Sequence, residues 1–333
     1  MIRLKKYGRL WNLCRTEQML SSWAENPENI SGILIKKNRN RAVWRVCADD
    51  GKTYFVKREK KFRFPFIASK AEKEFSAFAL LKEKGIPAAE CTAWSATMKD
   101  SILVTAALPD DYISIAEYWY SKPETDLEFL HHLCVFLKKI AQSGIRHPDF
   151  HAGNLMTNGK EIVMIDPVGI EATEESNTPQ SWILIPLMTV LGDIPRETIV
   201  EMLHTAGVYP TVFEAETMLE KMKKQQYELI EREWEKRQKQ ILSGTSKFAT
   251  ETGPGKFLRN SAWFSPGREY SENMLETTEL PEPEARELWL NSFRCQLMKT
   301  KCDIVPVIYE IKGKNGLISV LKDKKALFFY GFR

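Results

Sequence analysis

The residues best able to do chemistry lie near the middle of the chain. They read HPDFHAGN over residues 147–154 and are followed, after a turn and an apolar segment at 161–165, by Asp166. Phosphoryl transfer needs a carboxylate near the attacking hydroxyl and ligands for the metal that holds the phosphates, because positioning and charge neutralisation supply nearly all of the catalysis. Asp149, Asn154 and Asp166 offer these groups.

This spacing resembles that of the protein kinases, in which an aspartate, an asparagine and a second aspartate after a short hairpin act together. The resemblance implies that Asp149 orients the hydroxyl or accepts its proton, and that Asn154 and Asp166 hold Mg²⁺. The match ends at Pro167-Val168-Gly169, where protein kinases have Phe-Gly. We therefore expect no switch driven by that phenylalanine.

Two histidines in the same run allow a second interpretation, a metal pair four residues apart. His147 and His151 would form such a pair only on a helix, and Pro148 and Gly153 oppose a helix there. We reject a zinc site and interpret His147 as a residue that organises the loop around Asp149.

A lysine and a glutamate upstream complete the expected set. Lys57 ends the third of three β-rich segments, where a protein kinase places the lysine that binds the α- and β-phosphates. A buried lysine needs a partner, and the next helix begins with the capping box Ser69-Lys70-Ala71-Glu72. Because the box occupies Glu72, we expect Glu74, which lies on the apolar face, to pair with Lys57. The alternative is that Glu74 only borders that face and extends to water.

The turn that would cover the phosphates is unusual for a kinase. Residues 37–41 read KNRNR, and Gly32 is the nearest glycine. If this turn binds phosphate, side-chain charge contributes as much as the backbone. A basic and aromatic stretch at 57–66 is a further candidate for contact with anionic sugars, phosphates or lipid. The alternative is a solvated loop.

Periodicity and turn residues outline the rest of the chain. Strands are expected at 33–36, 42–48, 53–57, 91–97 and 101–105, followed by a kinase-like hinge at 106–109. Helices are expected at 127–141, 182–191, 196–205, 212–242 and 284–299. Residues 243–271 are expected to form a substrate-facing loop, and short strands are expected at 304–311, 317–321 and 326–330. We divide the chain into an N-terminal arm (1–29), an N-lobe with the nucleotide-binding sheet (30–106), a helical C-lobe with the catalytic loop (107–242), and a C-terminal extension without assigned chemistry (243–333).

Composition agrees with an ordinary globular protein. Of 333 residues, 43% are hydrophobic and 28% charged, and the net charge of +4 predicts no general affinity for nucleic acid. Six scattered cysteines indicate neither a disulfide framework nor a zinc site and fit a reducing cytoplasm. Neither a secretory signal peptide nor a membrane-spanning segment is expected.

Within the kinase-like superfamily, the chain resembles the bacterial lipopolysaccharide kinases that phosphorylate heptose or Kdo. The resemblance covers about residues 54–166 and is carried by FVKR at 55–58, AEKEF at 71–75 leading to GIP at 85–87, and HPDFHAGN followed by IDP at 165–167. It implies an α+β, two-lobed protein-kinase-like fold with a small antiparallel sheet lobe and a larger helical lobe. It also implies a cytoplasmic enzyme, peripheral at the inner membrane, that uses Mg²⁺ and ATP to phosphorylate a sugar hydroxyl of a lipid-linked acceptor, the lipopolysaccharide core.

Two other functions remain open on the same residues. One is a kinase for a soluble small molecule such as an aminoglycoside, since such kinases share the HxDxHxxN run. The other is a pseudokinase that regulates or scaffolds without catalysis. Asp149, Asn154, Asp166 and the Lys57–Glu74 pair argue against a pseudokinase, whereas Pro167 and the glycine-poor turn favour it.

Overall fold

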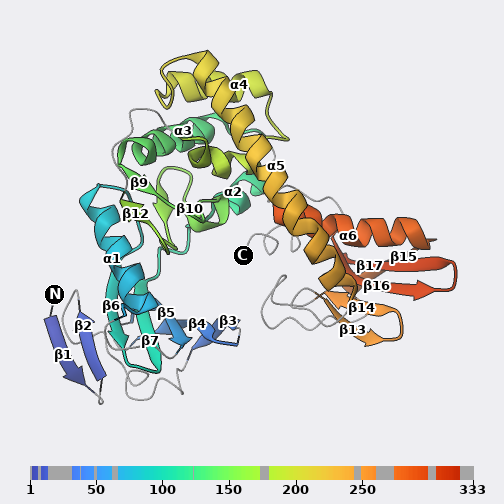
Figure 1. Cartoon of the computed structure of the whole chain (residues 1–333), viewed down its shortest axis with the longest axis horizontal. Coiled ribbons are helices and arrows are strands. Elements are labelled where there is room, and N and C mark those ends of the chain that lie inside the picture. The colour runs from blue at the N-terminus through green and yellow to red at the C-terminus, as the bar shows by residue number, and fades with distance from the viewer. Residues whose placement is uncertain are drawn as a thin grey trace. The chain divides into compact units, whose positions relative to one another are not determined.

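The computed structural model describes residues 2–6, 9–13, 32–37, 39–48, 51–61, 67–122, 124–172, 180–243, 249–259, 274–298 and 305–322. The chain forms two compact units. One comprises Met1–Ser114 and Lys138–Thr178, and the other comprises Ile115–Leu137 and Pro179–Arg333. Antiparallel sheets and helices make up both units (Figure 1), so the predicted α+β class is confirmed.

A seven-stranded antiparallel sheet forms most of the first unit. Its strand order is β1-β2-β6-β7-β5-β4-β3 (Figure 1). The strands are β1 (Ile2–Lys6), β2 (Arg9–Leu13), β3 (Ile33–Lys37), β4 (Arg41–Cys47), β5 (Thr53–Lys60), β6 (Cys91–Ala96) and β7 (Asp100–Ala106). The five strands expected between residues 33 and 105 are therefore present.

Part of the expected N-terminal arm belongs to this sheet. β1 and β2 form a hairpin, and β2 pairs with β6. Trp11 of β2 is fully buried in a cluster with residues such as Val56 and Ile102. Burial of the large indole explains why the hairpin joins the sheet, since an aromatic side chain contributes a large apolar area.

Helix α1 (Lys70–Glu83) packs on the sheet through Ala71 and Phe78, which cluster with Leu103 of β7. The predicted capping box is formed, with Ser69 accepting from the backbone of Glu72 and the Glu72 side chain accepting from the backbone of Ser69. This box satisfies backbone N–H groups that have no partner within the helix.

Short strands frame the HPDFHAGN run. β10 (Leu155–Thr157) lies between β11 (Ile162–Met164) and β8 (Ile113–Ser114), and β9 (Ile145–Arg146) pairs with β12 (Glu171–Ala172). The chain after α1 is tied to β11, because Ala89 N–H donates to Met164 O at 2.9 Å and Met164 N–H donates to Pro87 O at 3.0 Å.

The helices after β8 include the predicted ones in the predicted order, and also α2, which was not predicted. They are α2 (Ile115–Ser121), α3 (Leu127–Gln142), the 3₁₀ helix η4 (Ser181–Thr189), α4 (Arg196–Thr205) and α5 (Val212–Leu242). The segment expected as an apolar α-helix at 182–191 is thus a 3₁₀ helix with Pro186 inside it. Proline has no N–H to donate and its ring obstructs an α-helical turn, which accounts for the difference.

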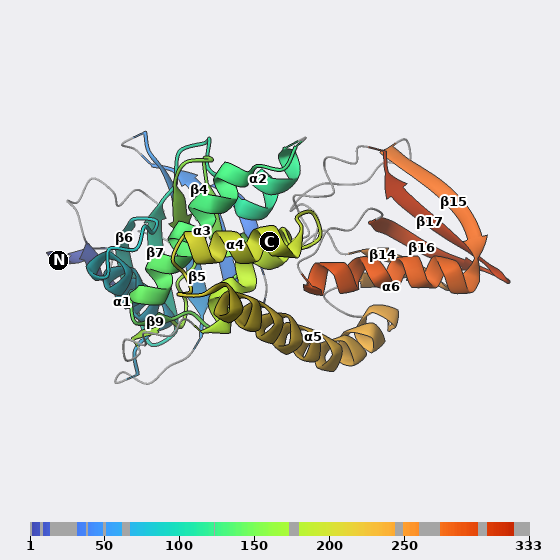
Figure 2. The same cartoon turned by 90° about the horizontal axis from the view of Figure 1, so that it is seen from above.

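A second antiparallel sheet lies near the C-terminal end, with the order β13-β14-β16-β17-β15. Its strands are β13 (Ala249–Gly253), β14 (Lys256–Arg259), β15 (Leu275–Pro281), β16 (Pro306–Lys312) and β17 (Asn315–Leu321), and α6 (Glu282–Met298) lies along one face (Figure 2). The interpretation of 243–271 as one substrate-facing loop was wrong for residues 249–259, which form a hairpin. Residues 260–271 and the strand expected at 326–330 lie outside the described part of the chain.

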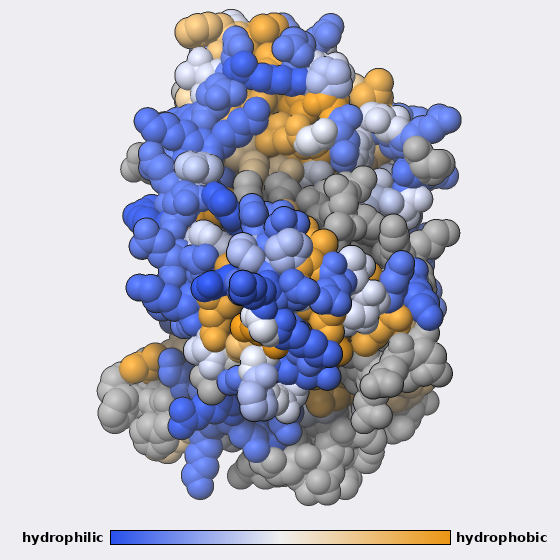
Figure 3. All heavy atoms as spheres, turned by 90° about the vertical axis from the view of Figure 1, so that its right-hand side faces the viewer, coloured by the Kyte–Doolittle hydropathy of each residue, from blue (hydrophilic) through white to orange (hydrophobic). Residues whose placement is uncertain are grey.

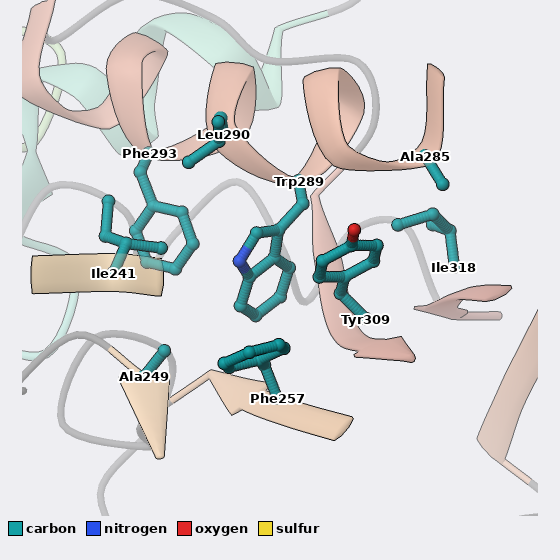
Figure 4. Packing of buried hydrophobic residues seen from close by; sticks show 9 residues of the cluster. All are labelled: Ile241, Ala249, Phe257, Ala285, Trp289, Leu290, Phe293, Tyr309 and Ile318. Carbon is teal, nitrogen blue, oxygen red and sulfur yellow. The ribbon is translucent and has the colours of Figure 1, made fainter. Parts of the chain in front are cut away.

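Aromatic rings fill the space between α6 and this sheet (Figure 4). Trp289 is fully buried, stacks on Tyr309 at 5.9 Å between ring centroids and meets Phe293 edge-on at 5.0 Å. Phe257 of β14 lies opposite Tyr309 of β16 and stacks on it, with 5.8 Å between the ring centroids. The buried Arg259 guanidinium lies 3.5 Å from the ring of Phe293. The C-terminal part therefore has a core of its own, to which Ile241 of α5 also contributes.

On the face drawn in Figure 3, hydrophilic side chains predominate over apolar ones among the atoms that are coloured. Among the described helices, none combines the length and the apolar character that crossing a membrane requires.

Candidate active site

The position of Lys57 follows from the sheet. On β5 it lies opposite Val43 of β4 and Leu103 of β7, in the interior of the seven strands. Its neighbours Val56 and Arg58 are buried on the other face. Because successive side chains of a strand point to opposite faces, the side chain of Lys57 lies on the face opposite to that of Val56 and Arg58.

Lys57 holds two carboxylates that come from distant parts of the sequence. Its Nζ donates to Oε1 of Glu74 on α1 and lies 3.2 Å from Oδ1 of Asp166. The side chain of Lys57 is 14% exposed and that of Glu74 only 3%. The expected ion pair is thus formed, and the alternative in which Glu74 extends to water does not hold.

The two carboxyl groups differ in their environment. Burial raises the pKa of Glu74 above its ordinary value, although Lys57 acts in the opposite direction. Burial also acts to raise the pKa of Asp166, but the charges of Lys57 and Arg41 outweigh it, and the pKa of Asp166 is lowered. Asp166 is 32% exposed. Of the two carboxyl groups, the more accessible one, that of Asp166, is therefore the one whose ionised form is favoured.

Arg41 also lies at the site, whereas the sequence indicated only the basic turn at 37–41 as a whole. Its guanidinium Nη2 lies 3.8 Å from Asp166 Oδ1 and 4.0 Å from Glu74 Oε2. The only available signal was the basic turn before β4, because the register that brings Arg41 to the same face as Lys57 is a property of the folded sheet.

His147 connects the backbone of Asp149 with that of Asp166. Its Nδ1 accepts the backbone N–H of Asp149 at 3.1 Å, so its Nε2 carries the proton and donates to the backbone carbonyl of Asp166 at 3.1 Å. Burial lowers the pKa of His147, which favours this neutral form. His147 therefore has the organising position expected for it.

The loop presents Asp149 outward on an internally bonded frame. Asn154 is buried and donates from Nδ2 to the backbone carbonyl of Asp149 at 2.9 Å. The Asp149 carboxylate is 75% exposed and lies 3.5 Å from Nε2 of His151, whose Nδ1 accepts the N–H of Gly153. A fixed backbone with an accessible carboxylate is what a base that meets a bound hydroxyl requires.

Asn154 and Asp166 fit the role of Mg²⁺ ligands. The amide nitrogen of Asn154 is directed to Asp149, which leaves the amide oxygen, the atom that binds Mg²⁺, on the other side of the group. Ile165 N–H donates to Asn154 O at 3.1 Å, so the two ligands leave adjoining backbone segments. Within the described ranges no three His, Cys, Asp or Glu side chains cluster as a metal site.

The turn after Asp166 packs against the run. Gly169 has a φ of +79°, and a Cβ there would lie 3.0 Å from Cγ of Pro148. The Pro-Val-Gly sequence that replaces Phe-Gly thus forms a tight turn beside the residue that precedes Asp149.

The basic stretch at 57–66 is only partly a surface feature. Arg58 is buried and donates from Nε and Nη2 to Oδ2 of Asp100 at 3.0 and 2.9 Å. Together with Lys57 it is used inside the fold, whereas Lys60 and Lys61 are exposed. Residues 62–66 lie outside the described part of the chain.

Comparison with known proteins gives likeness of structure only. No protein-family model matches the chain, and its sequence matches no curated protein. The structure is similar to that of the BubR1 kinase domain, with 11% identity and a TM-score of 0.40 over 66% of this chain and 81% of that one. It is also similar to the autoinhibited serine kinase domain of titin, with 13% identity and a TM-score of 0.33 over 42% of this chain and 44% of that one.

Proposed function

We propose that this chain is an ATP-dependent phosphotransferase whose acceptor is an alcohol. The observation that carries the proposal is the joint placement of an exposed Asp149, held through His147 to the segment of Asp166, and of Asp166 beside the buried Lys57–Glu74 pair. Lys57 would bind the nucleotide phosphates, Asn154 and Asp166 would hold Mg²⁺, and Asp149 would orient the hydroxyl or accept its proton. Bound Mg²⁺ would neutralise charge on the phosphates.

We propose further that the acceptor is a sugar hydroxyl, of heptose or Kdo, in the lipopolysaccharide inner core. The support is the resemblance over residues 54–166, together with the exposed Lys60 and Lys61 at the end of β5, which suit an anionic acceptor. Such an acceptor places the enzyme in the cytoplasm, in peripheral contact with the inner membrane.

Phosphate transfer from Mg·ATP to dephosphorylated lipopolysaccharide core tests both levels of the proposal. In the Asp149→Ala variant we expect transfer to fall about 10²- to 10⁴-fold, with Mg·ATP binding retained. Asp110→Ala is the matched control, because Asp110 is 92% exposed and paired only at the surface with Arg45. Near-normal transfer by Asp149→Ala would refute the assigned base.

Two measurements distinguish the alternatives, phosphate transfer for the first and thermal unfolding for the second. Transfer to a soluble aminoglycoside or amino sugar, with none to the lipid-linked core, would identify a small-molecule kinase. Absence of any rise in the unfolding midpoint with millimolar Mg·ATP would identify a pseudokinase, since a ligand that binds the native state must stabilise it.

A further inference from the structure

The turn between β3 and β4 carries positive charge where a kinase turn carries glycine. No glycine occurs between Gly32 and Gly51. Lys36, Lys37 and Arg39 are exposed on or beside the turn, which ends at Arg41. Glycine lets backbone N–H groups approach phosphates closely. In this chain, side chains must supply the missing attraction.

The sheet register selects Arg41 from these basic residues. Val43 lies directly opposite Lys57, and Arg41 precedes Val43 by two positions on the same strand. Since side chains two apart share a face of a strand, Arg41 and Lys57 are diagonal neighbours on one face. Arg41 is only 23% exposed, and its guanidinium reaches Asp166 and Glu74.

Arg41 and Lys57 share an anionic partner, the carboxylate of Asp166. Two cations, Arg41 and Lys57, now lie against Oδ1 of a single carboxylate, Asp166. Mg²⁺ bound to that carboxylate would repel the guanidinium and bring phosphate oxygens beside it. A guanidinium matches phosphate with two parallel N–H donors in a fixed geometry.

We propose that Arg41 is a phosphate-binding residue of the site, whose guanidinium, which lies beside Asp166 and Glu74, binds the terminal phosphates of a Mg²⁺-bound nucleoside triphosphate. This inference rests on the proposed function, because it assigns one more residue to the same nucleotide site. It makes the side chain of Arg41 a replacement for the glycine-rich turn.

The test compares nucleotide binding by the full-length protein and its Arg41→Gln variant by titration calorimetry. We expect the Kd for Mg·ATP to rise about tenfold or more, as for the loss of a hydrogen bond between charged groups. Adenosine, which lacks phosphates, should bind both proteins equally. Arg39→Gln is the matched control, since it removes the same charge from an exposed residue of the same turn, and should bind Mg·ATP like the wild type.

Each other outcome overturns the inference in a recognisable way. Equal Mg·ATP binding by Arg41→Gln and wild type refutes it and leaves the proposed kinase intact. Equal weakening by Arg39→Gln would show diffuse charge in place of a specific contact, and tighter binding by Arg41→Gln would show competition with Mg²⁺. A wild type that binds no Mg·ATP refutes the proposed function itself. If Arg41→Gln does not fold, Arg41→Lys keeps the charge without the two-pronged donor and should weaken Mg·ATP binding selectively.

Discussion

Lys57 is the side chain on which the charge balance of the site depends. Glu74 is almost fully withdrawn from water, and moving an ionised carboxylate out of water costs several kcal/mol unless a cation compensates it. Lys57 provides that compensation from the neighbouring strand. Without it, Glu74 must either remain ionised at a large cost or take up a proton.

The Lys57→Met variant should therefore lose stability in a pH-dependent way. We expect a loss of about 3 kcal/mol in the free energy of unfolding at pH 8 and a smaller loss at pH 5. Burial already raises the pKa of Glu74, and removal of Lys57, which lowers it, raises it further. A pKa that is higher in the folded than in the unfolded state gives stability that is present at low pH and lost as the pH rises through the folded value. Urea unfolding at both pH values measures the effect.

A double variant separates charge from packing. Lys57→Met combined with Glu74→Gln removes the carboxylate, so its stability should no longer decline between pH 5 and pH 8 relative to the wild type. If the double variant keeps the pH dependence of Lys57→Met, another group is responsible for it.

Residue-level prediction succeeded where a local rule was decisive. Glu74 was chosen over Glu72 because the capping box uses Glu72, and both residues have these positions. Arg41 was missed because its contact with Asp166 joins residues 125 positions apart, through a register that only the folded sheet defines. No local pattern in the sequence could distinguish it from the other basic residues of its turn.

At the level of elements, the turn after β11 controls the position of the loop that bears Asp149. Gly169→Ala should destabilise the protein by more than about 1 kcal/mol, the cost of placing an L-residue in the left-handed region. The new Cβ would also push Pro148, which it meets at 3.0 Å. We expect reduced phosphate transfer along with the lower midpoint of thermal unfolding.

Gly85→Ala is the control for this substitution. Gly85 has a φ of +65°, but a Cβ there would meet nothing within 4 Å. It should therefore show only the conformational cost and leave transfer unchanged. Equal effects of the two variants on transfer would contradict the contact with Pro148 as the cause.

The longer elements were predictable from the sequence, and several short polar strands were not. Helix α3 has a clear apolar period, and the observed bounds of α3, α4 and α5 agree closely with the predicted ones. β15 reads LETTELP and is exposed over most of its length, so it offers little hydrophobic alternation to detect. The hairpin at 249–259 was hidden because its glycines and proline also occur in irregular loops.

For the whole molecule, the separate aromatic core at the C-terminal end predicts separable stability. Trp289→Ala should cost about 3–5 kcal/mol, as expected for deletion of a buried aromatic side chain. Hydrogen exchange should accelerate in α6 and β16, which pack around this residue. Protection of α1 and β5 by Mg·ATP should persist, because those elements belong to the other compact unit.

Phe213→Ala is the matched aromatic deletion in the same unit. Phe213 is 75% exposed on α5, so its removal should change the exchange rates little. Loss of the Mg·ATP-dependent protection in Trp289→Ala would show that the two units unfold as one.

The α+β class of the molecule could be predicted, but the role of residues 243–333 could not. The motif residues are contiguous or separated by recognisable elements, which is why the HPDFHAGN run and the strand that bears Lys57 could be located from the sequence. The C-terminal sheet and helix carry no motif that would indicate chemistry, and their aromatic residues are used in packing. The four-part division of the chain stays a prediction.

The link between α1 and β11 has a mechanical consequence. Lys57 is bonded to Glu74 of α1, and the chain that follows α1 is hydrogen-bonded through Ala89 to Met164 of β11. Asp166, two residues after Met164, is bonded in turn to Lys57, which closes the loop of contacts. Such a closed linkage resists an outward swing of the helix, because the swing would break the ion pair at one end and pull on β11 at the other. We therefore expect α1 to keep its position, and Glu74 its ion pair with Lys57, whether or not a ligand is bound.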